Sequence, residues 1–484
     1  MNIHIVSTKR MPSVDVEIVG VFEDQKTPKG TDAAASAIIA TRQLQEKFGK
    51  LYDLRLIPST DRRVKKAFAV IGLGKAKTFN IAKARNVVAS AVRGIAPIKP
   101  STVSVSLKDV GGESMLEAVI DGVVFGVYEH HYKTEKKEQR ITDVTIVTDA
   151  RDAESRTNHA RIIADAVSFV RKLVDEPANT MTPTRLADRA KELERFSGIT
   201  TRIIGEKEAK AMGMGAFAAV SQGSDEEGKV IVVEYKGSAK KDKPVIGLVG
   251  KGITFDTGGL SLKSDKAMET MKCDMAGAAT VLGIIAALAQ KKAPVRVIGI
   301  AMAAENSPSG KAIRPGDVVM ALSGKTVEIL NTDAEGRLVV ADGVTYADRL
   351  GATHIIDLAT LTGACMVALG SEIVGLFSGD APLAEKLMQA SKKTGERVWQ
   401  LPMDEDFDEE IKGTIADYKN VGEKYGGATT AAKFIQLVSA TKKPWVHLDI
   451  AGPSFEEKGK PWMGKGGTGV MVRTLVQLTE EMSA

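Results

Sequence analysis

Cysteine is scarce in this chain: its 484 residues include only Cys273 and Cys365. Two thiols cannot form a disulfide framework, and neither belongs to a CxxC pair, so we expect a reducing compartment. Long hydrophobic runs are lacking as well. The longest, such as VLGIIAALA at 281–289, are too short to cross a bilayer, and the N-terminal MNIHIVSTKRMPSVDV lacks an apolar core of secretory length. The sequence therefore predicts a soluble cytoplasmic protein.

The motifs of several common enzyme classes are also missing. None of the six histidines lies in an HExxH pattern, which excludes that type of single-zinc peptidase. GLGKAK at 72–77 has the spacing of neither a phosphate loop nor a dinucleotide fingerprint, and no G-x-S-x-G occurs. His354 and His447 lie inside apolar strand-like runs, where we expect hydrogen-bonded core histidines. With 66 basic and 61 acidic residues, the formal charge of +5 is too small to demand a nucleic-acid partner.

The length and the order of the predicted elements indicate an α/β protein of two domains. A chain of 484 residues exceeds the size at which a single hydrophobic core keeps growing. A long helix is predicted from about Arg156, ending before Asp175-Glu176-Pro177 because the residue before a proline disfavours helix. We place the boundary there, giving domains of 1–155 and 156–484; this helix either bridges the domains or begins the second.

Strand-like and helix-like segments alternate in both domains, as in an α/β sheet. In the first domain we expect strands at 14–22, 66–74, 101–107 and 143–149 and helices at 33–48 and 82–95. In the second we expect strands at 229–237, 244–252, 294–304, 352–361 and 444–452. Several of these are continuous apolar runs, typical of strands buried on both faces, and ligands gather at the carboxyl ends of such strands.

Polar clusters follow two of these runs. In GKGITFDTGGLSLK, 250–263, Lys251 and Asp256 come just past a buried strand and Lys263 follows a glycine turn. Asp274 begins a helix of small residues shortly afterwards. The second cluster, NTDAEGRL at 331–338, carries two more acids and opens an amphipathic helix.

These clusters predict a centre for two divalent metal ions. Asp333 and Glu335 lie two positions apart, with Arg337 directly after them. Together with the acids of the first cluster they make four carboxylates beside buried strands, which repel one another unless cations neutralise them. Two dications would do so, and carboxylates can bridge them. A lysine such as Lys251 must lose its proton to bind a metal, and the charge of the metal favours that loss.

Two motifs together resemble the signature of the leucyl aminopeptidase (cytosol aminopeptidase) family. One is NTDAEGRL, and the other, about seventy residues earlier, is GKGITFDTGG with the lysine and aspartate that follow it. Further segments resemble that family in order over roughly 165–475, namely LVDEPANTMTPTRLA, PSGKAIRPGDVV, DLATLTGAC, YGGATTAAKFI and WVHLDIAG. The resemblance implies a smaller N-terminal α/β domain with a mixed sheet. It also implies a larger C-terminal catalytic domain with a central mixed β-sheet flanked by helices. The implied activity is removal of single residues from the free N-terminus of peptides.

Carried over to matching positions, the resemblance makes Asp256 and Glu335 the ligands that bridge two metal ions. Lys251 and Asp274 complete the looser site, and Asp333 completes the tighter one. The oxygen-rich ligand set admits manganese or zinc, and also magnesium or cobalt. We expect a water or hydroxide shared by the two ions to be the nucleophile.

The resemblance also assigns catalytic and substrate-binding positions. Lys263 matches the residue that polarises the scissile carbonyl, and Arg337 matches the one that holds a bicarbonate acting as the proton shuttle. An apolar first side-chain pocket, suited to leucine, is implied at Met271, Thr360, Gly363 and Ala451, and backbone groups around Leu361 are expected to align the peptide. Similar proteins assemble as hexamers, so we expect a homohexamer acting on peptides.

A regulatory, sequence-specific DNA-binding role of the N-terminal domain is the alternative function, since some members of the family bind DNA. The basic stretches 62–66, 75–85 and 136–140 are compatible with it. They lack the interleaved aromatic residues that stack on bases, so a solvated basic face is the favoured interpretation.

Four residues near the clusters have ordinary structural interpretations. Ser264 and Asp265 stand where many relatives have a proline, which bears on loop rigidity rather than on the ligand set. Cys273, beside Asp274, is expected to be a small packed residue. Asp342 is expected to support the ligands or to be solvated rather than to be a ligand itself.

Overall fold

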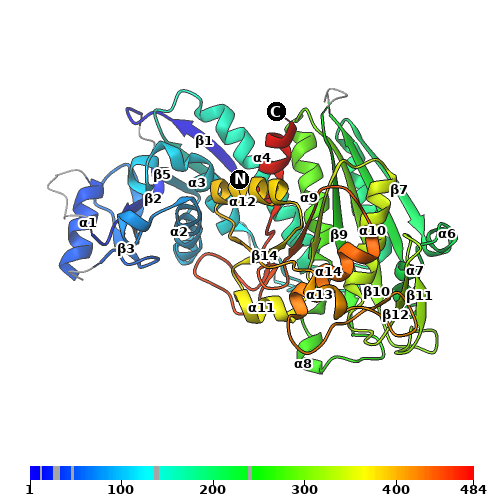
Figure 1. Cartoon of the computed structure of the whole chain (residues 1–484). Coiled ribbons are helices and arrows are strands. Elements are labelled where there is room, and N and C mark those ends of the chain that lie inside the picture. The colour runs from blue at the N-terminus through cyan, green and yellow to red at the C-terminus, as the bar shows by residue number, and fades with distance from the viewer. Residues whose placement is uncertain (11–12, 25–32, 45–47, 136–140, 238–242, 484) are drawn as a thin grey trace. The chain divides into compact units, whose positions relative to one another are not determined.

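The structure is a computed structural model that describes the chain except residues 11–12, 25–32, 45–47, 136–140, 238–242 and 484. The chain divides into two compact units, shown in Figure 1. Unit 1 comprises Met1–Ser168 and Lys458–Lys465, and unit 2 comprises Phe169–Glu457 and Gly466–Ala484. Each unit combines a β-sheet with helices, which confirms the predicted α/β class.

Unit 1 is built on a six-stranded sheet in the order β1-β6-β5-β2-β4-β3. Neighbouring strands are parallel except β3, which pairs antiparallel with β4. The strands are β1 (Asn2–Val6), β2 (Val14–Val21), β3 (Leu54–Pro58), β4 (Val64–Gly72), β5 (Thr102–Ser106) and β6 (Asp143–Val147). The helices are α1 (Ala33–Leu44), α2 (Ile81–Gly94) and α3 (Leu116–Val127), with 3-10 turns η1 (Ala76–Thr78), η2 (Ala96–Ile98), η3 (Leu107–Val110) and η4 (Glu113–Met115).

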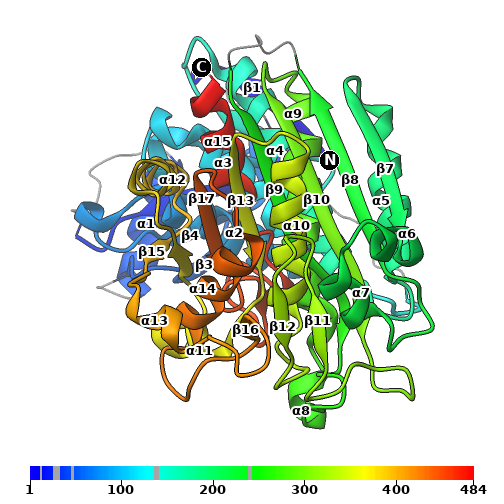
Figure 2. The same ribbon diagram turned by 45° about the vertical axis from the view of Figure 1, so that its right-hand side comes forward.

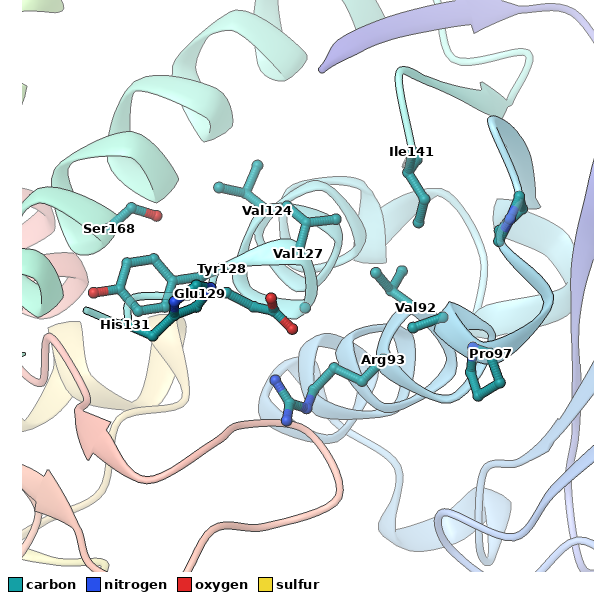
Figure 3. Close-up of a pocket in the computed structure, with 13 residues that line it drawn as sticks. Val92, Arg93, Pro97, Val124, Val127, Tyr128, Glu129, His131, Ile141 and Ser168 are labelled. Carbon is teal, nitrogen blue, oxygen red and sulfur yellow. The ribbon is translucent and has the colours of Figure 1, made fainter. Parts of the chain in front are cut away.

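Two apolar clusters form the core of unit 1. The larger joins the central strands to α2 and α3, with Ile18 and Val105 fully buried in it. The smaller joins Val19 and Val21 of β2 to Ala37 of α1. The unit also holds a cavity of about 740 Å³, seen in Figure 3, whose lining is largely apolar. The residues around it are Val92, Arg93, Ala96, Pro97, Pro100, Val124, Gly126, Val127, Tyr128, Glu129, His131, Ile141 and Ser168.

Unit 2 is built on an eight-stranded mixed sheet in the order β15-β14-β17-β13-β9-β10-β8-β7, shown in Figure 2. The central strands β17, β13, β9 and β10 run parallel, and β8 and β7 continue the sheet antiparallel. The sheet strands are β7 (Ile199–Gly205), β8 (Lys229–Lys236), β9 (Val245–Asp256), β10 (Arg296–Asn306), β13 (His354–Ala359), β14 (Val374–Phe377), β15 (Val398–Gln400) and β17 (Trp445–Asp449). Smaller sheets are formed by β11 (Val318–Met320), β12 (Thr326–Glu328) and β16 (Tyr418–Lys419), and by β18 (Phe455–Glu456) and β19 (Gly466–Gly467).

Helices cover both faces of this sheet. A β-carbon on Gly343 of α10 would touch Val249 of β9, whereas one on the next strand residue, Gly250, would touch Ala278 of α9. Because successive strand residues point to opposite faces, α10 and α9 lie on opposite sides of the sheet. The helices of unit 2 are α5 (Pro183–Lys191), α6 (Glu206–Ala211), α7 (Gly215–Ser221), α8 (Asp265–Met268), α9 (Ala276–Gln290), α10 (Gly336–Arg349), α11 (Gly363–Leu369), α12 (Ala381–Thr394), α13 (Asp406–Glu409), α14 (Gly427–Ser439) and α15 (Val472–Ser483), with 3-10 turns η5 (Glu192–Arg195) and η6 (Met271–Met275).

One continuous stretch, Met271–Gln290, has the length and apolar character of a membrane-spanning helix, but it is 94% buried inside the protein. Apolar composition on all sides is what a helix needs when it is enclosed between a sheet and other helices. The stretch is therefore explained as the core helix of unit 2.

The predicted strands and helices are confirmed to within a few residues at their ends. The long helix α4 (Ala153–Asp175) begins before the predicted Arg156 and ends at Asp175, one residue later than predicted and still short of Pro177. The predicted helix 33–48 corresponds to α1, with 45–47 outside the described residues. One expectation is corrected: Lys251 and Asp256 lie within a strand rather than past it, because β9 stays paired with β10 as far as Asp256.

Candidate metal centre

Strand β9 and the turn η6 bring the first predicted residues together. Lys251 shares the α10-facing side of β9 with Val249, two positions before it. Its Nζ lies 2.8 Å from Oδ1 and 2.7 Å from Oδ2 of Asp274, which η6 carries at the start of α9. Lys251 Nζ also donates to the carbonyl oxygen of Thr360, at 3.1 Å. The ammonium group is thus fixed from two sides.

The NTDAEGRL segment, which is the second of the two polar clusters in the sequence, also contacts Lys251. The backbone N–H of Asp333 donates to Oδ1 of Asn331 at 2.8 Å, which closes a tight turn before α10. At the end of this turn Glu335 places its Oε1 2.7 Å from Lys251 Nζ. The two sequence clusters therefore meet through a buried lysine.

Lys263 links the remaining two acids. Its Nζ lies 2.8 Å from Oδ2 of Asp256 and also forms a short contact with Oδ1 of Asp333. Asp256 is held in place at its other oxygen, because the side-chain amide of Asn306 and the backbone N–H of Gly258 donate to Oδ1 at 2.9 and 2.8 Å. All five predicted ligands and Lys263 form one continuous cluster, because Glu335 lies close to both Asp256 and Asp333.

The donor set of this cluster fits divalent cations. Ligand atoms of Asp256, Asp333 and Glu335 all lie within 4.8 Å of one another. Both carboxylate oxygens of Glu335 and Oδ2 of Asp274 are buried without a hydrogen bond of normal geometry among the described residues. Four carboxylates face two ammonium groups, so the cluster keeps an excess of negative charge that a cation can neutralise.

The electrostatics of the cluster are dominated by burial and by neighbouring charges. Burial raises the pKa of Asp274 and of Glu335, since a carboxylate loses hydration there, and neighbouring carboxylates raise both further. Burial opposes the charge of Lys251 and Lys263, but the surrounding carboxylates outweigh it and raise the pKa of both. Asp333 is the most accessible acid, with 33% of its side chain exposed, and burial raises its pKa too.

Arg337 lies in the first turn of α10 and is almost completely buried. Its Nη1 donates to the carbonyl oxygen of Asn420 at 2.9 Å, while its Nε is buried without a hydrogen-bond partner in the described part of the chain. Burial lowers the pKa of Arg337 to about 10, against the opposing effect of Glu335 and Asp449, so it remains charged at neutral pH. An unsatisfied, charged N–H is suited to a small anion.

The predicted substrate-binding residues differ in how they are connected to the cluster. Thr360 contacts it directly, since its Oγ1 donates to Oδ1 of Asp274 at 2.7 Å. Met271 opens the turn η6 that carries Asp274, and Gly363 begins α11. Leu361 and Ala451 are both half-buried, and the backbone N–H groups of both donate to one carboxylate, that of Asp449.

Sequence reasoning missed two residues that organise this region. Asn306 ends β10 and joins Asp256 to the carbonyl oxygen of Thr332, to which its amide donates at 3.0 Å. Asp449 ends β17. Both are polar residues at the carboxyl ends of buried strands, which is a signal that could have found them.

Three residues for which the sequence indicated a structural role have hydrogen-bond partners in the structure. Ser264 caps α8, its Oγ accepting from the N–H of Ala267. Asp342 is not solvated: it is fully buried and accepts from the N–H groups of Leu322 and Phe217 at 2.7 and 2.9 Å. His447 is a hydrogen-bonded core histidine, as predicted, with Nδ1 2.5 Å from Oδ1 of Asp357.

Two further residues singled out from the sequence, Cys273 and His354, differ in their burial. It raises the pKa of the Cys273 thiol to about 12, which fits a packed side chain. His354 is hydrogen-bonded as predicted, with its Nδ1 3.0 Å from Oγ1 of Thr353, but the expected core position is wrong: it is only half-buried, because it begins β13. Neither residue belongs to the group of three acids whose ligand atoms converge in the described structure.

Comparison with known proteins gives a consistent result over the whole chain. Residues 168–476 match the catalytic domain of the cytosol aminopeptidase family, and residues 18–136 match its N-terminal domain. A probable cytosol aminopeptidase of Koribacter versatilis is 43% identical over 470 residues, which cover 92% of this chain and 91% of that protein. One of Alkaliphilus metalliredigens is 41% identical over 486 residues, which cover 97% of each.

Solved structures agree. A mutant of tomato leucine aminopeptidase superposes with a TM-score of 0.89 at 31% identity, covering 99% of this chain and 96% of that one. The bottromycin maturation enzyme BotP in complex with Mn superposes with a TM-score of 0.86 at 32% identity, covering 97% of this chain and 100% of that one.

Proposed function

This chain belongs to the cytosol aminopeptidase family, a family of metal-dependent peptidases, and we propose that it removes leucine and other apolar residues from the N-terminus of peptides. One observation carries this proposal: Lys251, Asp256, Asp274, Asp333 and Glu335 converge from β9, η6 and the turn before α10 on a single buried cluster. We assign these five residues as the ligands of two divalent ions. Lys251 would bind as the neutral amine, because the charge of a bound ion favours loss of the proton that the carboxylates hold in the metal-free cluster.

The proposed ions are manganese or zinc, with magnesium or cobalt as further candidates. Carboxylate oxygens suit all four, and a single amine ligand excludes none of them. The similarity to BotP, which has been solved with Mn, favours manganese as the first ion to test. When bound, the ions supply Lewis-acid polarisation of the scissile carbonyl and a water made acidic enough to react at neutral pH.

Lys263 acts in this proposal as the electrophile beside the ions. Its raised pKa keeps it protonated at neutral pH. Asp256 and Asp333 hold its ammonium at the edge of the cluster, so the group is oriented before substrate arrives. An N–H donor fixed in advance stabilises the negative charge that develops on the carbonyl oxygen in the transition state.

Arg337 is proposed to bind a bicarbonate ion that serves as the general base. The guanidinium is charged, and the bond from Nη1 to Asn420 fixes its plane. Its planar set of donors matches a planar oxyanion, which a lysine could not match in the same way. The unpartnered Nε among the described residues supports this role.

The exopeptidase specificity follows from the substrate's free α-amine, which we propose as a ligand of one ion. An internal peptide bond offers no such amine. Thr360 is hydrogen-bonded to Asp274, and the backbone of Leu361 follows directly in the chain. A peptide bound at the ions would therefore place its first side chain in the proposed pocket formed by Met271, Thr360, Gly363 and Ala451. The apolar character of that set favours leucine-like side chains.

We further propose that the protein acts in the cytoplasm as a homohexamer. Large apolar side chains of unit 2 are exposed in the single chain, among them Val367 at 90%, Tyr425 at 76% and Ile415 at 70%. A contiguous patch of exposed apolar side chains is typical of a surface that a partner covers, so these are the residues that we propose lie at contacts between subunits. Light scattering coupled to size exclusion tests this assembly, and a mass corresponding to one chain would contradict it.

The DNA-binding alternative receives less support. Arg63 pairs with Asp61, and Arg85 is buried against Asp121, so part of the basic charge in two of the three stretches is already neutralised. The third stretch, 136–140, lies outside the described residues. A salt-dependent shift of duplex DNA at low protein concentration would revive this role.

The deciding experiment is hydrolysis of leucine p-nitroanilide by metal-stripped protein resupplied with Mn²⁺ or Zn²⁺ alone. Activity is expected to return with metal, and the N-acetylated substrate is expected to be refused. Glu335→Gln is expected to stay inactive. Glu396→Gln is the matched control, because Glu396 is buried but bonds to the N–H groups of Met471 and Thr474 instead. Activity that survives chelation would contradict the proposal.

A further inference from the structure

A fully buried carboxylate beside the candidate metal centre holds two separate backbone segments. Asp449, the last residue of β17, has no exposed surface. Its Oδ1 accepts from the N–H of Leu361 at 3.2 Å and of Ala451 at 3.1 Å, and its Oδ2 accepts from the hydroxyl of Thr362 at 2.7 Å. Three donors therefore converge on one side chain.

Both segments carry positions that the proposed function assigns to substrate. Leu361 lies between β13 and α11, and Ala451 lies just past β17. β13 and β17 are parallel neighbours, so their carboxyl ends emerge side by side. Asp449 joins the segments that follow β13 and β17 at the point where both would face the first residue of a peptide.

The segment after β13 is also attached to the metal cluster on its other side. Thr360 accepts from Lys251 at its carbonyl oxygen and donates to Asp274 through its hydroxyl, at 3.1 and 2.7 Å. One residue later the chain is bonded to Asp449. The segment is thus held between the predicted ligands and Asp449, and its position depends on both.

A role in packing alone does not account for a carboxylate here. Burying a charged group is unfavourable unless hydrogen bonds or an opposite charge compensate it. Among the described residues Asp449 forms no ion pair, and its negative charge is compensated by the three donors and by the nearby positive charge of Arg337. An aspartate has the acceptor capacity to take all three at once, on two oxygens.

We propose that Asp449 is a positioning residue, which sets the distance between the substrate pocket and the metal centre by fixing Leu361, Thr362 and Ala451. The inference rests on the proposed function, because it concerns where the substrate of that reaction lies. The side chain touches neither the predicted ligands nor the reacting atoms in the described contacts. It acts through the backbone that it holds.

The test compares Asp449→Asn and Asp449→Ala with the matched control Asp342→Asn, in Mn²⁺-loaded protein. Asp342 is also a fully buried aspartate that accepts from two backbone N–H groups, but it holds Leu322 and Phe217 rather than a substrate segment. KM and kcat are measured with leucine and alanine p-nitroanilide, and bound metal is measured by elemental analysis.

Asp449→Ala is expected to raise KM for the leucine substrate by roughly tenfold or more and to reduce the preference for leucine over alanine to a few-fold, with metal content unchanged. Asp449→Asn keeps an oxygen for the two N–H donors and is expected to recover most of the loss. Thr362→Val removes the donor to Asp449, together with the bond that Oγ1 accepts from the N–H of Cys365 at the start of α11, and is expected to shift KM in the same direction. Thr362→Ser keeps both bonds and is expected to match wild type. This pair carries the test if Asp449→Ala does not fold.

Two results would overturn the inference. The first is a KM and a leucine preference within twofold of wild type in Thr362→Val and, where it folds, in Asp449→Ala. The second is a loss of activity that follows loss of bound metal, because Asp449 would then support the ligands instead of the pocket. Failure of the proposed function is recognised separately: metal-loaded wild-type protein would cleave neither substrate.

Discussion

The side chain of Lys251 lies directly against the backbone of Gly336: a β-carbon on Gly336 would come within 2.6 Å of Lys251 Cε and 2.8 Å of its Nζ. Lys251 cannot move aside easily, because Asp274 and Glu335 hold its ammonium from two directions. The first residue of α10 must therefore lack a side chain for Glu335 to reach the cluster.

Gly336→Ala is expected to disrupt the metal centre. The added methyl displaces Lys251 or α10, so we expect metal affinity to fall by about tenfold and kcat/KM by more, with an overpacking cost of about 1–3 kcal/mol. Metal titration and kinetics measure these effects. Gly310→Ala is the control, because a β-carbon there would meet nothing within 4 Å. Equal metal affinity and equal kcat/KM in Gly336→Ala and Gly310→Ala would refute the inference that Lys251 leaves no room for a side chain at position 336.

Lys263→Met is expected to lower kcat by roughly 10²–10³-fold while both metal ions remain bound. Lys263 contributes a charged donor to the transition state but is not one of the proposed ligands. Steady-state kinetics with parallel metal analysis separate the two roles. Lys266→Met, an exposed lysine on α8, is expected to leave kcat unchanged. Loss of metal from Lys263→Met would reassign this lysine to the ligand set.

Arg337→Lys is expected to lower kcat and to abolish stimulation by bicarbonate. A lysine keeps the charge but loses the planar pair of donors and the fixed bond to Asn420. Wild-type protein in bicarbonate-depleted buffer is expected to gain activity when bicarbonate is added. Arg314→Lys, which changes an arginine paired with Asp317 at the surface, is the control. Stimulation that persists in Arg337→Lys would place the anion elsewhere.

The free energy of unfolding of unit 2 is expected to fall as the pH rises from acid to neutral, because the carboxyl group of Asp342 loses its proton. Burial raises the pKa of this carboxyl from 3.8 to about 7, against the opposing effect of the bonds from Leu322 and Phe217. Between these values the folded protein binds more protons than the unfolded chain, so the stabilisation is complete below pH 3.8 and is lost as the pH passes about 7.

The midpoint of urea unfolding at several pH values between 4 and 8 measures this effect in wild type and in Asp342→Asn. The variant cannot titrate at this position, so the difference between the two proteins isolates Asp342. Wild type is expected to lose stability relative to the variant toward pH 8. Parallel pH profiles would show that Asp342 does not exchange a proton in this range.

Much of the fold could be predicted because the signals are local. The continuous apolar runs at 244–252 and 294–304 became the adjacent strands β9 and β10, and Pro177 fixed the end of α4. Strands such as β7 and β14 were not predicted, since β7 is only partly buried and β14 has four residues. Their place in the sheet depends on pairing with distant strands.

The sequence by itself determined which residues are predicted to carry the chemistry: the resemblance of NTDAEGRL and GKGITFDTGG to a family signature implied Lys251, Asp256, Asp333, Glu335 and Arg337 as one set. Only the tertiary structure decided how that set is held. The bond from Asn306 to Asp256 spans 50 positions, and the bond from Leu361 to Asp449 spans 88. Such contacts depend on which strands become neighbours, and strand order arises from long-range pairing and burial that local residue patterns do not encode.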